Sequence, residues 1–404
     1  MPAETGLNSF LSKIILLDAG VFMSELEIAI FGAGRTAENI GLTIVQNSEA
    51  LEKKFELVII NPNDMKKNSN RAELVAKELN QSGIPLGKDY DVKYGHENAE
   101  APDIAVFALG RQRKEGEKRS DLFDDNSKAI FETAADYCPK NNISLADSFI
   151  IEVGNPVGSM SHVLYKGLEK SAIEEGVAAN PKKIAASGTG LDTARAKEII
   201  LNGHLKKNPE LKKYGLKDIE FMAGAGHDNS VVFTEEYGAI GGKPIRDVLG
   251  EETVASVCGR VKGMGAEYNK HGGVGPSVGG DVFGILESVV NNKNENTLAL
   301  TPVSISSDEG LSVLGLSGKN IFDYVKKHSP ENSSEKILRH MDYVWTGTNS
   351  KIGSEGVISP NIPKYGDEEK HHFEISVAET VLETMRGYYK GGVLRPFLNH
   401  EIKK

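Results

Sequence analysis

Three side chains in the second half of the sequence could do acid–base chemistry and bind an anion. Asp192 and Arg195 stand three residues apart in SGTGLDTARAKEII (187–200), at the expected start of a helix, so they should project from one side of it. His227 stands among small residues in GAGHDNSVVF (224–233). Taken separately, such an Asp–Arg pair is more typical of an ordinary surface, and a single histidine is more often structural.

A strongly basic segment, GRQRKEGEKRSDLF (110–123), lies in the first half. Its nine residues 111–119 include five cations: Arg111, Arg113, Lys114, Lys118 and Arg119. The chain as a whole has a formal net charge of −10, which disfavours binding to bulk nucleic acid. The local cations therefore favour a small anion as the ligand, with a solvated surface loop as the simpler alternative.

A glycine-rich turn near the start of the sequence is typical of nucleotide binding. The apolar run LEIAIF (26–31) predicts a buried parallel strand, and GAGRTAENIG follows at once. Gly32 allows a tight turn, Gly34 lets a pyrophosphate approach the backbone, and Ala37 allows close helix packing. The phosphates would lie at the helix N-terminus, where unpaired N–H groups favour anions.

The second predicted strand bears on the choice of cofactor. FELVIINP (55–62) ends near the position of a ribose-binding acid, and Asn61 occupies that position. An amide can bind ribose hydroxyls but does not repel a 2′-phosphate, so both NAD and NADP remain open. Asp64 is the alternative ribose-binding residue.

The remaining elements of the first half alternate between helix and strand. The patterns predict helices over 70–81 and 121–137, a strand over 103–109 that Gly110 closes, and a strand in 148–160 that ends at Asn155-Pro156. This alternation predicts a doubly wound α/β sheet. The basic segment then follows the carboxyl end of a parallel strand, where such sheets bind their ligands.

Composition narrows the class of protein. The 404 residues are 39% hydrophobic and 26% charged, as expected for a globular protein with a substantial core. The two cysteines, Cys138 and Cys258, form no metal-binding cluster, so we expect no metal site and a reducing cytoplasm. The apolar run 10–22 contains Lys13 and Asp18, and we expect no membrane association.

Five motifs together carry a resemblance to a known family. With GAGRTA, DIAVFALGRQRKEGEKRSDL, EVGNPVGSM, GTGLDTARAKEI and GHDNS in this order, the chain resembles the lactate/malate dehydrogenase family over residues 26–300. The resemblance implies a Rossmann domain followed by a mixed α+β catalytic domain. It also implies reversible oxidation of a 2-hydroxy acid with NAD or NADP, and a homodimer or homotetramer.

The resemblance assigns roles to the acid–base residues. His227 would donate a proton to the substrate oxygen and accept it in the reverse direction, and Asp192 would orient its ring and favour its charged form. Arg195 would bind the C1 carboxylate of the substrate with two hydrogen bonds. Asn155 would bind near the reacting oxygen and the cofactor, and Gly110 would contact the cofactor.

The resemblance also divides the basic segment. Arg119 would stabilise charge on the reacting carbonyl. Arg113 falls on the position that selects the substrate: an arginine there favours a dicarboxylate, because pyruvate would leave a desolvated cation unpaired. Malate and oxaloacetate are therefore favoured over lactate and pyruvate. The other three cations are interpreted as solvated charges of a closing loop.

The expected domain organisation has three parts: an N-terminal extension (1–25), a Rossmann domain (26–156) and a catalytic domain (157–404) with an insertion around 317–369. We expect this insertion to be a surface elaboration. The run GGVGPSVGGD (272–281), with five glycines, is expected to be flexible. Asp228 beside His227 departs from the family pattern and leaves the working pH open.

Three alternatives remain. The first is a lactate dehydrogenase or another 2-hydroxyacid dehydrogenase of the same family. The second is a metal-dependent glycosidase of family-4 type, which would need Cys or His ligands near Asn155 that the sequence lacks. The third is a non-catalytic nucleotide-binding protein whose insertion binds a partner.

Overall fold

The structure is a computed structural model. It describes residues 26–67, 70–84, 91–99, 101–111, 114, 117, 119–227, 230–270, 276–293, 295–305, 311–312, 314–329, 334–389 and 391–398. The expected extension, residues 1–25, lies outside this part of the chain. Within the described ranges, no helix has the length and apolar character needed to cross a membrane.

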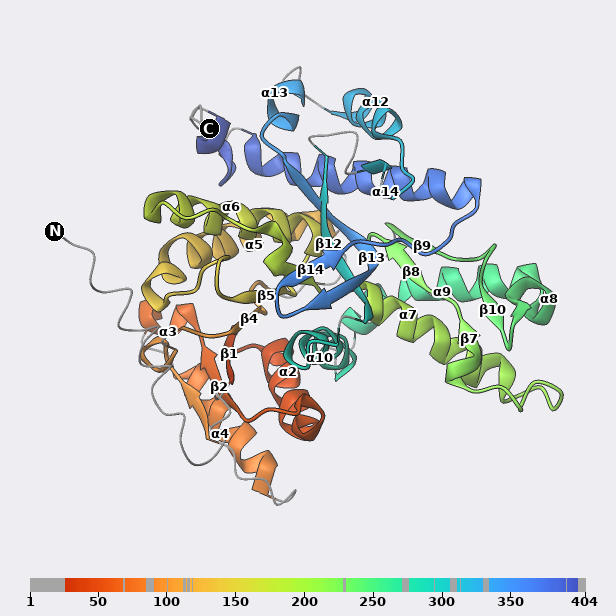
Figure 1. The fold of residues 1–404 in the computed structure, drawn as a ribbon, viewed down its shortest axis with the longest axis horizontal. Helices are drawn as coiled ribbons and strands as arrows, with labels where there is room; N and C mark the ends of the chain where they lie inside the picture. The colour runs from red at the N-terminus through yellow and green to blue at the C-terminus, as the bar shows by residue number, and fades with distance from the viewer. Residues whose placement is uncertain are drawn as a thin grey trace.

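Six parallel strands form the first half of the main sheet (Figure 1). They are β1 (Leu26–Phe31), β2 (Phe55–Ile60), β3 (Val92–Tyr94), β4 (Ile104–Phe107), β5 (Phe149–Glu152) and β6 (Ile184–Ala186). Their order is β3-β2-β1-β4-β5-β6, and every adjacent pair is parallel. This is the Rossmann order, with the topological switch point between β1 and β4.

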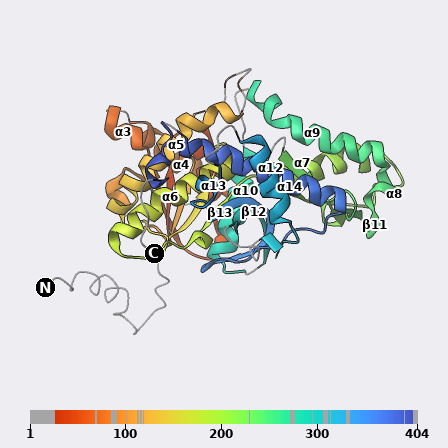
Figure 2. The ribbon, with the colours of Figure 1, turned by 90° about the horizontal axis from the view of Figure 1, so that it is seen from above.

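Helices cover both faces of this sheet, because its strands are apolar on both sides. One face carries α2 (Arg35–Gln46), α4 (Arg71–Gly83) and α10 (Pro276–Val290). The other carries α5 (Phe123–Glu132), α6 (Val157–Glu175) and α14 (Asp367–Met385). Figure 2 shows α14 lying along α6. A short helix, α3 (Pro62–Lys67), follows β2.

The second half continues the same sheet with antiparallel strands. The order after β6 is β12 (Asn296–Ser304), β13 (Tyr343–Gly353), β8 (Ala223–Ala225) and β9 (Val231–Phe233), with β14 (Gly356–Ser359) also paired to β13. The doubly wound parallel sheet followed by a mixed α+β part agrees with the predicted fold class.

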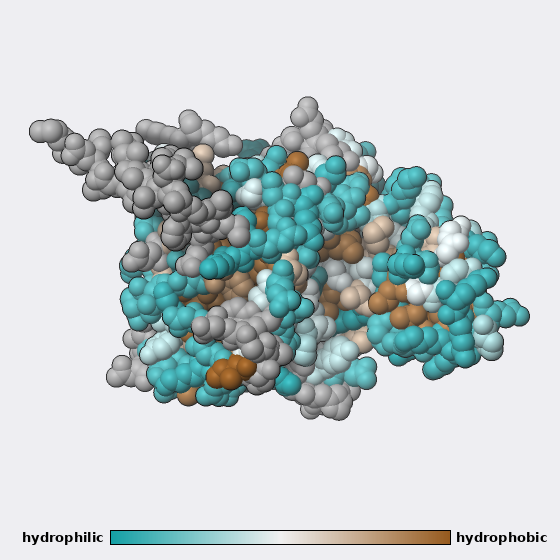
Figure 3. All heavy atoms as spheres, turned by 60° about the horizontal axis from the view of Figure 1, so that its bottom comes forward, coloured by the Kyte–Doolittle hydropathy of each residue, from teal (hydrophilic) through white to brown (hydrophobic). Residues whose placement is uncertain are grey.

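A smaller lobe projects from this half. It contains α7 (Thr189–Glu198), α8 (Ile245–Leu249), α9 (Glu251–Lys270) and the three-stranded sheet of β7 (Ile219–Glu220), β10 (Ala239–Ile240) and β11 (Lys243–Pro244). Its core includes Phe221 and Phe233, whose rings stack with centroids 5.4 Å apart. Figure 3 shows hydrophobic atoms gathered between this lobe and the larger body, within a mostly hydrophilic surface.

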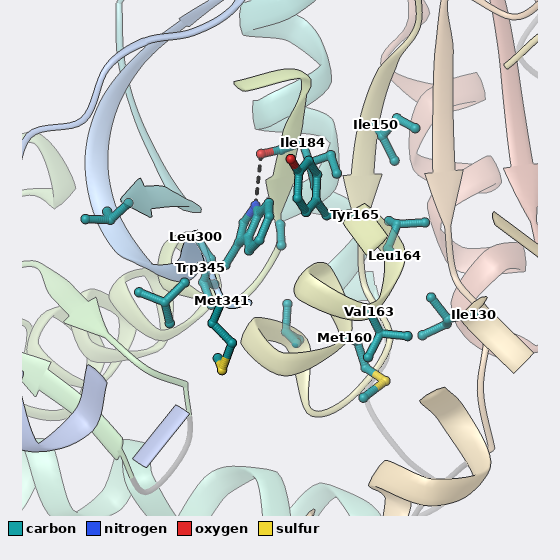
Figure 4. Close-up of a cluster of buried hydrophobic side chains, with 14 of the residues drawn as sticks. Ile130, Ile150, Met160, Val163, Leu164, Tyr165, Ile184, Leu300, Met341 and Trp345 are labelled. Atoms are coloured by element: carbon teal, nitrogen blue, oxygen red, sulfur yellow. Dashed lines mark hydrogen bonds between the residues drawn. The ribbon is translucent and has the colours of Figure 1, made fainter. Parts of the chain in front are cut away.

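The range 317–369 is not a surface elaboration throughout. It holds α12 (Gly318–His328) and α13 (Ser334–Leu338), but also β13, a strand inside the main sheet. Trp345 on β13 is fully buried, and its indole N–H donates to the carbonyl of Ile184 at 3.2 Å (Figure 4). The surface expectation is therefore wrong for β13, because apolar burial places this strand in the core.

Three further expectations on local structure need correction. The strand expected within 148–160 ends at Glu152, and α6 begins at Val157. The helix expected over 121–137 begins as a 3-10 turn at Arg119–Leu122 and ends as a π-helical turn at Thr133–Tyr137. Residues 276–281 of the run expected to be flexible form the first turns of α10, which Pro276 opens with its fixed φ.

Candidate active site

The turn between β6 and α7 positions Asp192 and Arg195. Gly188 precedes the helix with φ of +143°, a conformation that L side chains rarely adopt. The N–H of Asp192 donates to the Gly188 carbonyl at 2.9 Å, which fixes the first turn of α7. Asp192 is 0% exposed and Arg195, one turn later, is 5% exposed. The site therefore holds a buried acid and a buried cation on one helix.

The end of β8 positions His227. A Cβ on Gly224 would lie 2.1 Å from the hydroxyl of Tyr365, and one on Gly226 would lie 1.9 Å from Oγ of Ser230. Only glycine therefore lets the chain run this close beneath its neighbours. The His227 ring follows directly, with 10% of its side chain exposed.

Asp192 connects the other two residues. Its Oδ2 lies 2.5 Å from Nδ1 of His227, and its Oδ1 accepts a hydrogen bond from Nη1 of Arg195 at 3.0 Å. A carboxylate at Nδ1 selects the imidazole tautomer that carries its proton there, so proton exchange with a substrate falls to Nε2. The structure thus brings together the three residues that the sequence singled out.

Arg195 has donors that the described residues do not use. Its Nε and Nη2 are buried and have no hydrogen-bond partner in the described part of the chain. The ring of Tyr268 lies 5.4 Å from Cζ and covers one face of the guanidinium. Nε and Nη2 form one edge of the guanidinium, which suits a carboxylate bound through both oxygens. Because buried donors are seldom left unpaired, this edge indicates an anionic ligand.

A second carboxyl group, which sequence reasoning missed, lies near this pair. Oδ2 of Asp281 on α10 accepts hydrogen bonds from Oγ of Ser187 at 2.6 Å and from the N–H of Gly188 at 2.7 Å. Burial raises the pKa of Asp281 from 3.8 to about 6, against the lowering effect of those hydrogen bonds and of His227. An acid at the end of the glycine-rich run was the only signal for it in the sequence.

The basic segment is described only in part. Arg113 lies outside the described residues, and Arg119 begins a 3-10 turn whose backbone alone is described at that position. The guanidinium of Arg111 binds Glu117 at 2.7 Å and Asp125 at 2.6 Å. Arg111 therefore ties this segment to α5, while its side chain stays 31% exposed.

The glycine-rich turn after β1 fits a dinucleotide. Gly32 has φ of +126°, and a Cβ there would lie 2.5 Å from the Ala108 carbonyl oxygen. A Cβ on Gly34 would meet nothing within 4 Å, and α2 begins there without a side-chain cap. The N-terminus of α2 therefore lies at this turn, where helix N–H groups and the helix dipole favour phosphate oxygens. Ala37 is fully buried at the packing position that the motif assigns to it.

The end of β2 carries both candidate ribose-binding residues. The side-chain amide of Asn61 donates to Oδ1 of Asp64 at 2.7 Å, and Oδ2 of Asp64 accepts from the N–H of Ala72 at 2.9 Å. Nε of Arg71 donates to the carbonyl of Ala33 within the glycine-rich turn. An amide, a carboxylate and a cation therefore lie beside the place where an adenosine ribose would bind.

A buried asparagine, which the sequence did not indicate, joins the loops after β4 and β5. Asn126 accepts from the N–H of Arg111 at 2.9 Å and donates to the carbonyl of Asn155 at 2.6 Å. Gly110 has φ of +123°, and a Cβ there would lie 2.8 Å from the Asn126 amide. This contact places Gly110 and Asn155 at the same edge of the sheet.

Glu152 was also missed, although it ends β5 only three residues before Asn155. It is fully buried, its Oε1 accepts from the N–H of Gly154 at 2.5 Å, and its Oε2 has no partner in the described part of the chain. Burial raises the pKa of this carboxyl well above its ordinary value. Burial therefore disfavours the charged form of Glu152.

No group of three or more His, Cys, Asp or Glu residues in the described ranges could hold a metal ion. The two cysteines are buried and unpaired, and burial raises the pKa of each thiol.

Both the sequence and the fold of this chain are similar to those of known proteins. A family model described as the NAD binding domain of lactate/malate dehydrogenase matches residues 26–173. The malate dehydrogenase of Methanosarcina acetivorans is 27% identical over 342 residues, with coverage of 81% of this chain and 99% of the relative.

Two solved structures illustrate the shared fold. The malate dehydrogenase of Picrophilus torridus in its apo form has a TM-score of 0.66 at 20% identity, covering 90% of this chain and 97% of that one. A lactate dehydrogenase of Cryptosporidium parvum, complexed with lactic acid and nicotinamide adenine dinucleotide, has a TM-score of 0.67 at 14% identity. It covers 90% of this chain and 99% of its own. At these identities the likeness concerns the fold alone.

Proposed function

Because the chain belongs to the lactate/malate dehydrogenase family, whose NAD-binding domain it contains, we propose that it is a malate dehydrogenase. In this proposal it interconverts malate and oxaloacetate. The observation that carries the proposal is the buried set of Asp192, His227 and Arg195, in which one edge of the arginine has no hydrogen-bond partner among the described residues. A bound nicotinamide cofactor supplies or accepts the hydride.

Proton transfer falls to His227. Reduction of a keto group produces an alkoxide that needs a proton, and Nε2 of the protonated ring donates it. Asp192 holds Nδ1 at 2.5 Å, which orients the ring and stabilises its positive charge. In malate oxidation the neutral ring removes the hydroxyl proton.

Substrate orientation falls to Arg195. Nε and Nη2 bind the two oxygens of the C1 carboxylate, and the ion pair with Asp192 keeps the guanidinium plane fixed. Arg195 and His227 both bind Asp192. The position of the bound substrate carboxylate relative to the proton donor is therefore fixed. Asn155 is proposed to bind near the reacting oxygen and the cofactor.

Selection of a dicarboxylate is assigned to the basic segment. In the proposal Arg113 pairs with the second carboxylate of oxaloacetate, and Arg119 stabilises charge on the reacting carbonyl. The family membership supports these roles through the spacing of the motif. The alternative within the family is a lactate dehydrogenase or another 2-hydroxyacid dehydrogenase, in which Arg113 does not meet a second carboxylate.

Cofactor choice between NAD and NADP is a separate part of the proposal. The family's NAD-binding domain supports NAD, and the carboxylate of Asp64 disfavours a 2′-phosphate beside it. Arg71, at the start of α4, donates to the glycine-rich turn at Ala33, and its cation would pair with such a phosphate. We therefore propose NAD as the main cofactor, with NADP as the alternative. A cytoplasmic homodimer or homotetramer completes the proposal.

The test is a spectrophotometric assay of reduced nicotinamide consumption. The protein is supplied with NADH or NADPH, and then with oxaloacetate, pyruvate or a longer 2-keto acid. The proposal expects the fastest turnover with NADH and oxaloacetate. Faster turnover of pyruvate would favour the lactate alternative. Cofactor binding without turnover of any keto acid would favour the non-catalytic alternative.

A further inference from the structure

Asp281 links α10 to the turn that carries the acid–base residues. It lies in the second turn of α10, and its Oδ2 accepts from Oγ of Ser187 at 2.6 Å and from the N–H of Gly188 at 2.7 Å. Its carboxylate thereby caps the start of α7 from a neighbouring helix, where negative charge is favourable. These two bonds fix the turn relative to α10.

Gly188 contacts both members of the proton-transfer pair. A Cβ built on Gly188 would lie 3.2 Å from Cγ of His227, so the glycine backbone packs against the imidazole. The carbonyl of Gly188 accepts from the N–H of Asp192 at 2.9 Å. A group that holds Gly188 therefore holds the ring and the carboxylate that orients it.

The sequence of the turn leaves room for this carboxylate. A Cβ on Gly190 would lie only 2.0 Å from Oδ1 of Asp281. On its outer side Asp281 lines a cavity of about 510 Å³ between α7, α10 and β12, together with Ser277 and Gly280. The carboxyl is thus placed tightly between the turn and this cavity.

A neutral residue could make the same hydrogen bonds without the free-energy cost of burying a charge. Burial of the carboxyl disfavours its charged form, yet the group is still mostly ionised at neutral pH because its pKa is about 6. An asparagine would offer an acceptor to Ser187 and Gly188 without that cost. The difference between the two is the negative charge, which acts on His227.

Among the described residues, the charge of His227 acts favourably on the ionised Asp281 carboxyl through space, and that of Asp192 acts unfavourably. The other charged or titratable residues on elements packed against α10, including the 3-10 helix Ser48–Leu51, are Arg35, Glu38, Glu49, Glu152, Arg195, Lys197, Glu198, Tyr343 and Lys351. The strand β12 carries no titratable side chain. His227 is thus the favourable partner of this charge.

We propose that Asp281 is a positioning residue, which holds His227 and the start of α7 through Ser187 and Gly188, and whose negative charge favours the protonated imidazole. The inference rests on the proposed function, because it deepens the role given to His227. It predicts that the charge sets the pH range in which the ring serves as proton donor, whereas the hydrogen bonds set its position.

The test separates charge from hydrogen bonding with two variants and one matched control. Asp281→Asn keeps the shape and an acceptor oxygen, and Asp281→Ala removes both. Glu287→Gln makes the same chemical change as the first variant on the same helix, at a residue paired with Lys293 at 2.8 Å on the surface. The readouts are an NMR titration of the His227 ring, assigned with His227→Asn, and the pH profile of kcat/KM for keto-acid reduction.

We expect Asp281→Asn to move the midpoint of the His227 titration and the matching limb of the pH profile to lower pH, by about half a unit to one unit. The keto-acid KM at the optimum should change less than about twofold, because Arg195 is untouched. Asp281→Ala should show the same shift and a lower kcat at every pH.

Glu287→Gln should leave the His227 titration and the pH profile of kcat/KM at their wild-type positions. If Asp281→Asn also leaves both unchanged, the inference is overturned. A failure of Asp281→Ala to fold would leave this comparison intact, because the asparagine variant carries it. If the wild type reduces no keto acid, the proposed function fails, but the NMR titration still decides the role of Asp281.

Discussion

The carboxylate of Asp192 lies 2.5 Å from Nδ1 of His227 through Oδ2, and its other oxygen holds Arg195 at 3.0 Å. One buried acid therefore fixes both the proposed proton donor and the proposed carboxylate-binding group. Any movement of α7 changes the two together, so binding and proton transfer should respond jointly to changes in the β6–α7 turn.

Replacement of the proton donor should stop the reaction without removing the cofactor. For His227→Asn we expect kcat/KM for oxaloacetate to fall by about 10²–10⁴-fold, because asparagine cannot donate a proton to the alkoxide. NADH binding, measured by fluorescence titration, should stay unchanged. His371→Asn, at an exposed position on α14, is the control and should keep wild-type turnover. An active His227→Asn variant would remove His227 from the mechanism.

Arg195→Lys tests the two-pronged carboxylate grip. Lysine keeps the charge but has only one nitrogen, so we expect the substrate KM to rise about 10- to 100-fold. Initial rates over a range of oxaloacetate concentrations measure this effect. Arg246→Lys, which changes a surface arginine paired with Glu235, should leave KM at its wild-type value. Equal KM values for the two variants would mean that Arg195 does not bind the substrate.

The close packing between Gly190 and Asp281 predicts a cost in stability. Gly190→Ala would place a methyl group 2.0 Å from Oδ1 of Asp281, so we expect a loss of about 1–3 kcal/mol in the free energy of unfolding. Gly284→Ala on α10 is the control, because a Cβ there meets nothing within 4 Å. It should stabilise the helix by about 0.5–1 kcal/mol. Chemical denaturation of both variants measures the difference.

The pH dependence of stability should carry the signature of Asp281. Its pKa is raised from 3.8 to about 6 in the folded protein, so the contribution of this group to stability is greatest below 3.8 and is lost as pH rises through about 6. The Asp281→Asn variant has no titrating group at this position, so it does not lose this stability as pH rises. We expect the unfolding free energy of the variant, minus that of the wild type, to rise across this window, by on the order of 1–3 kcal/mol.

Denaturation curves of the two proteins at several pH values provide the measurement. Outside the window the difference between them should be constant, because Asp281 then has the same protonation state in the folded and unfolded protein. A difference that stays flat, or falls with rising pH, would show that the carboxyl is not held as the structure places it.

Features that depend on neighbouring residues in the sequence could be predicted. Features that depend on how helices and strands pack together could not. The strand and glycine turn at Gly32 follow from short-range rules, and the fold class followed from alternating elements. The resemblance singled out Asp192, Arg195 and His227, although their contacts cross from α7 to the end of β8. Their geometry needed the mixed half of the sheet, whose strand order no local pattern specifies.

Asp281 and Asn126 could not be found in the same way. Each binds backbone groups of a distant loop, and such contacts depend on how helices pack on the sheet. Glycines near Asp281 suggested flexibility, whereas in the structure Gly279 packs against Thr43 and Asn39 of α2. A glycine can serve close packing as well as flexibility, and one sequence does not distinguish the two.

The most direct test of the central claim is the ratio of kcat/KM for oxaloacetate to that for pyruvate, measured with NADH in the wild type and in Arg113→Gln. The account predicts a ratio well above one in the wild type and a fall of at least about tenfold in the variant, caused by loss of oxaloacetate turnover. A wild-type preference for pyruvate, or an equal loss for both substrates in the variant, would contradict it.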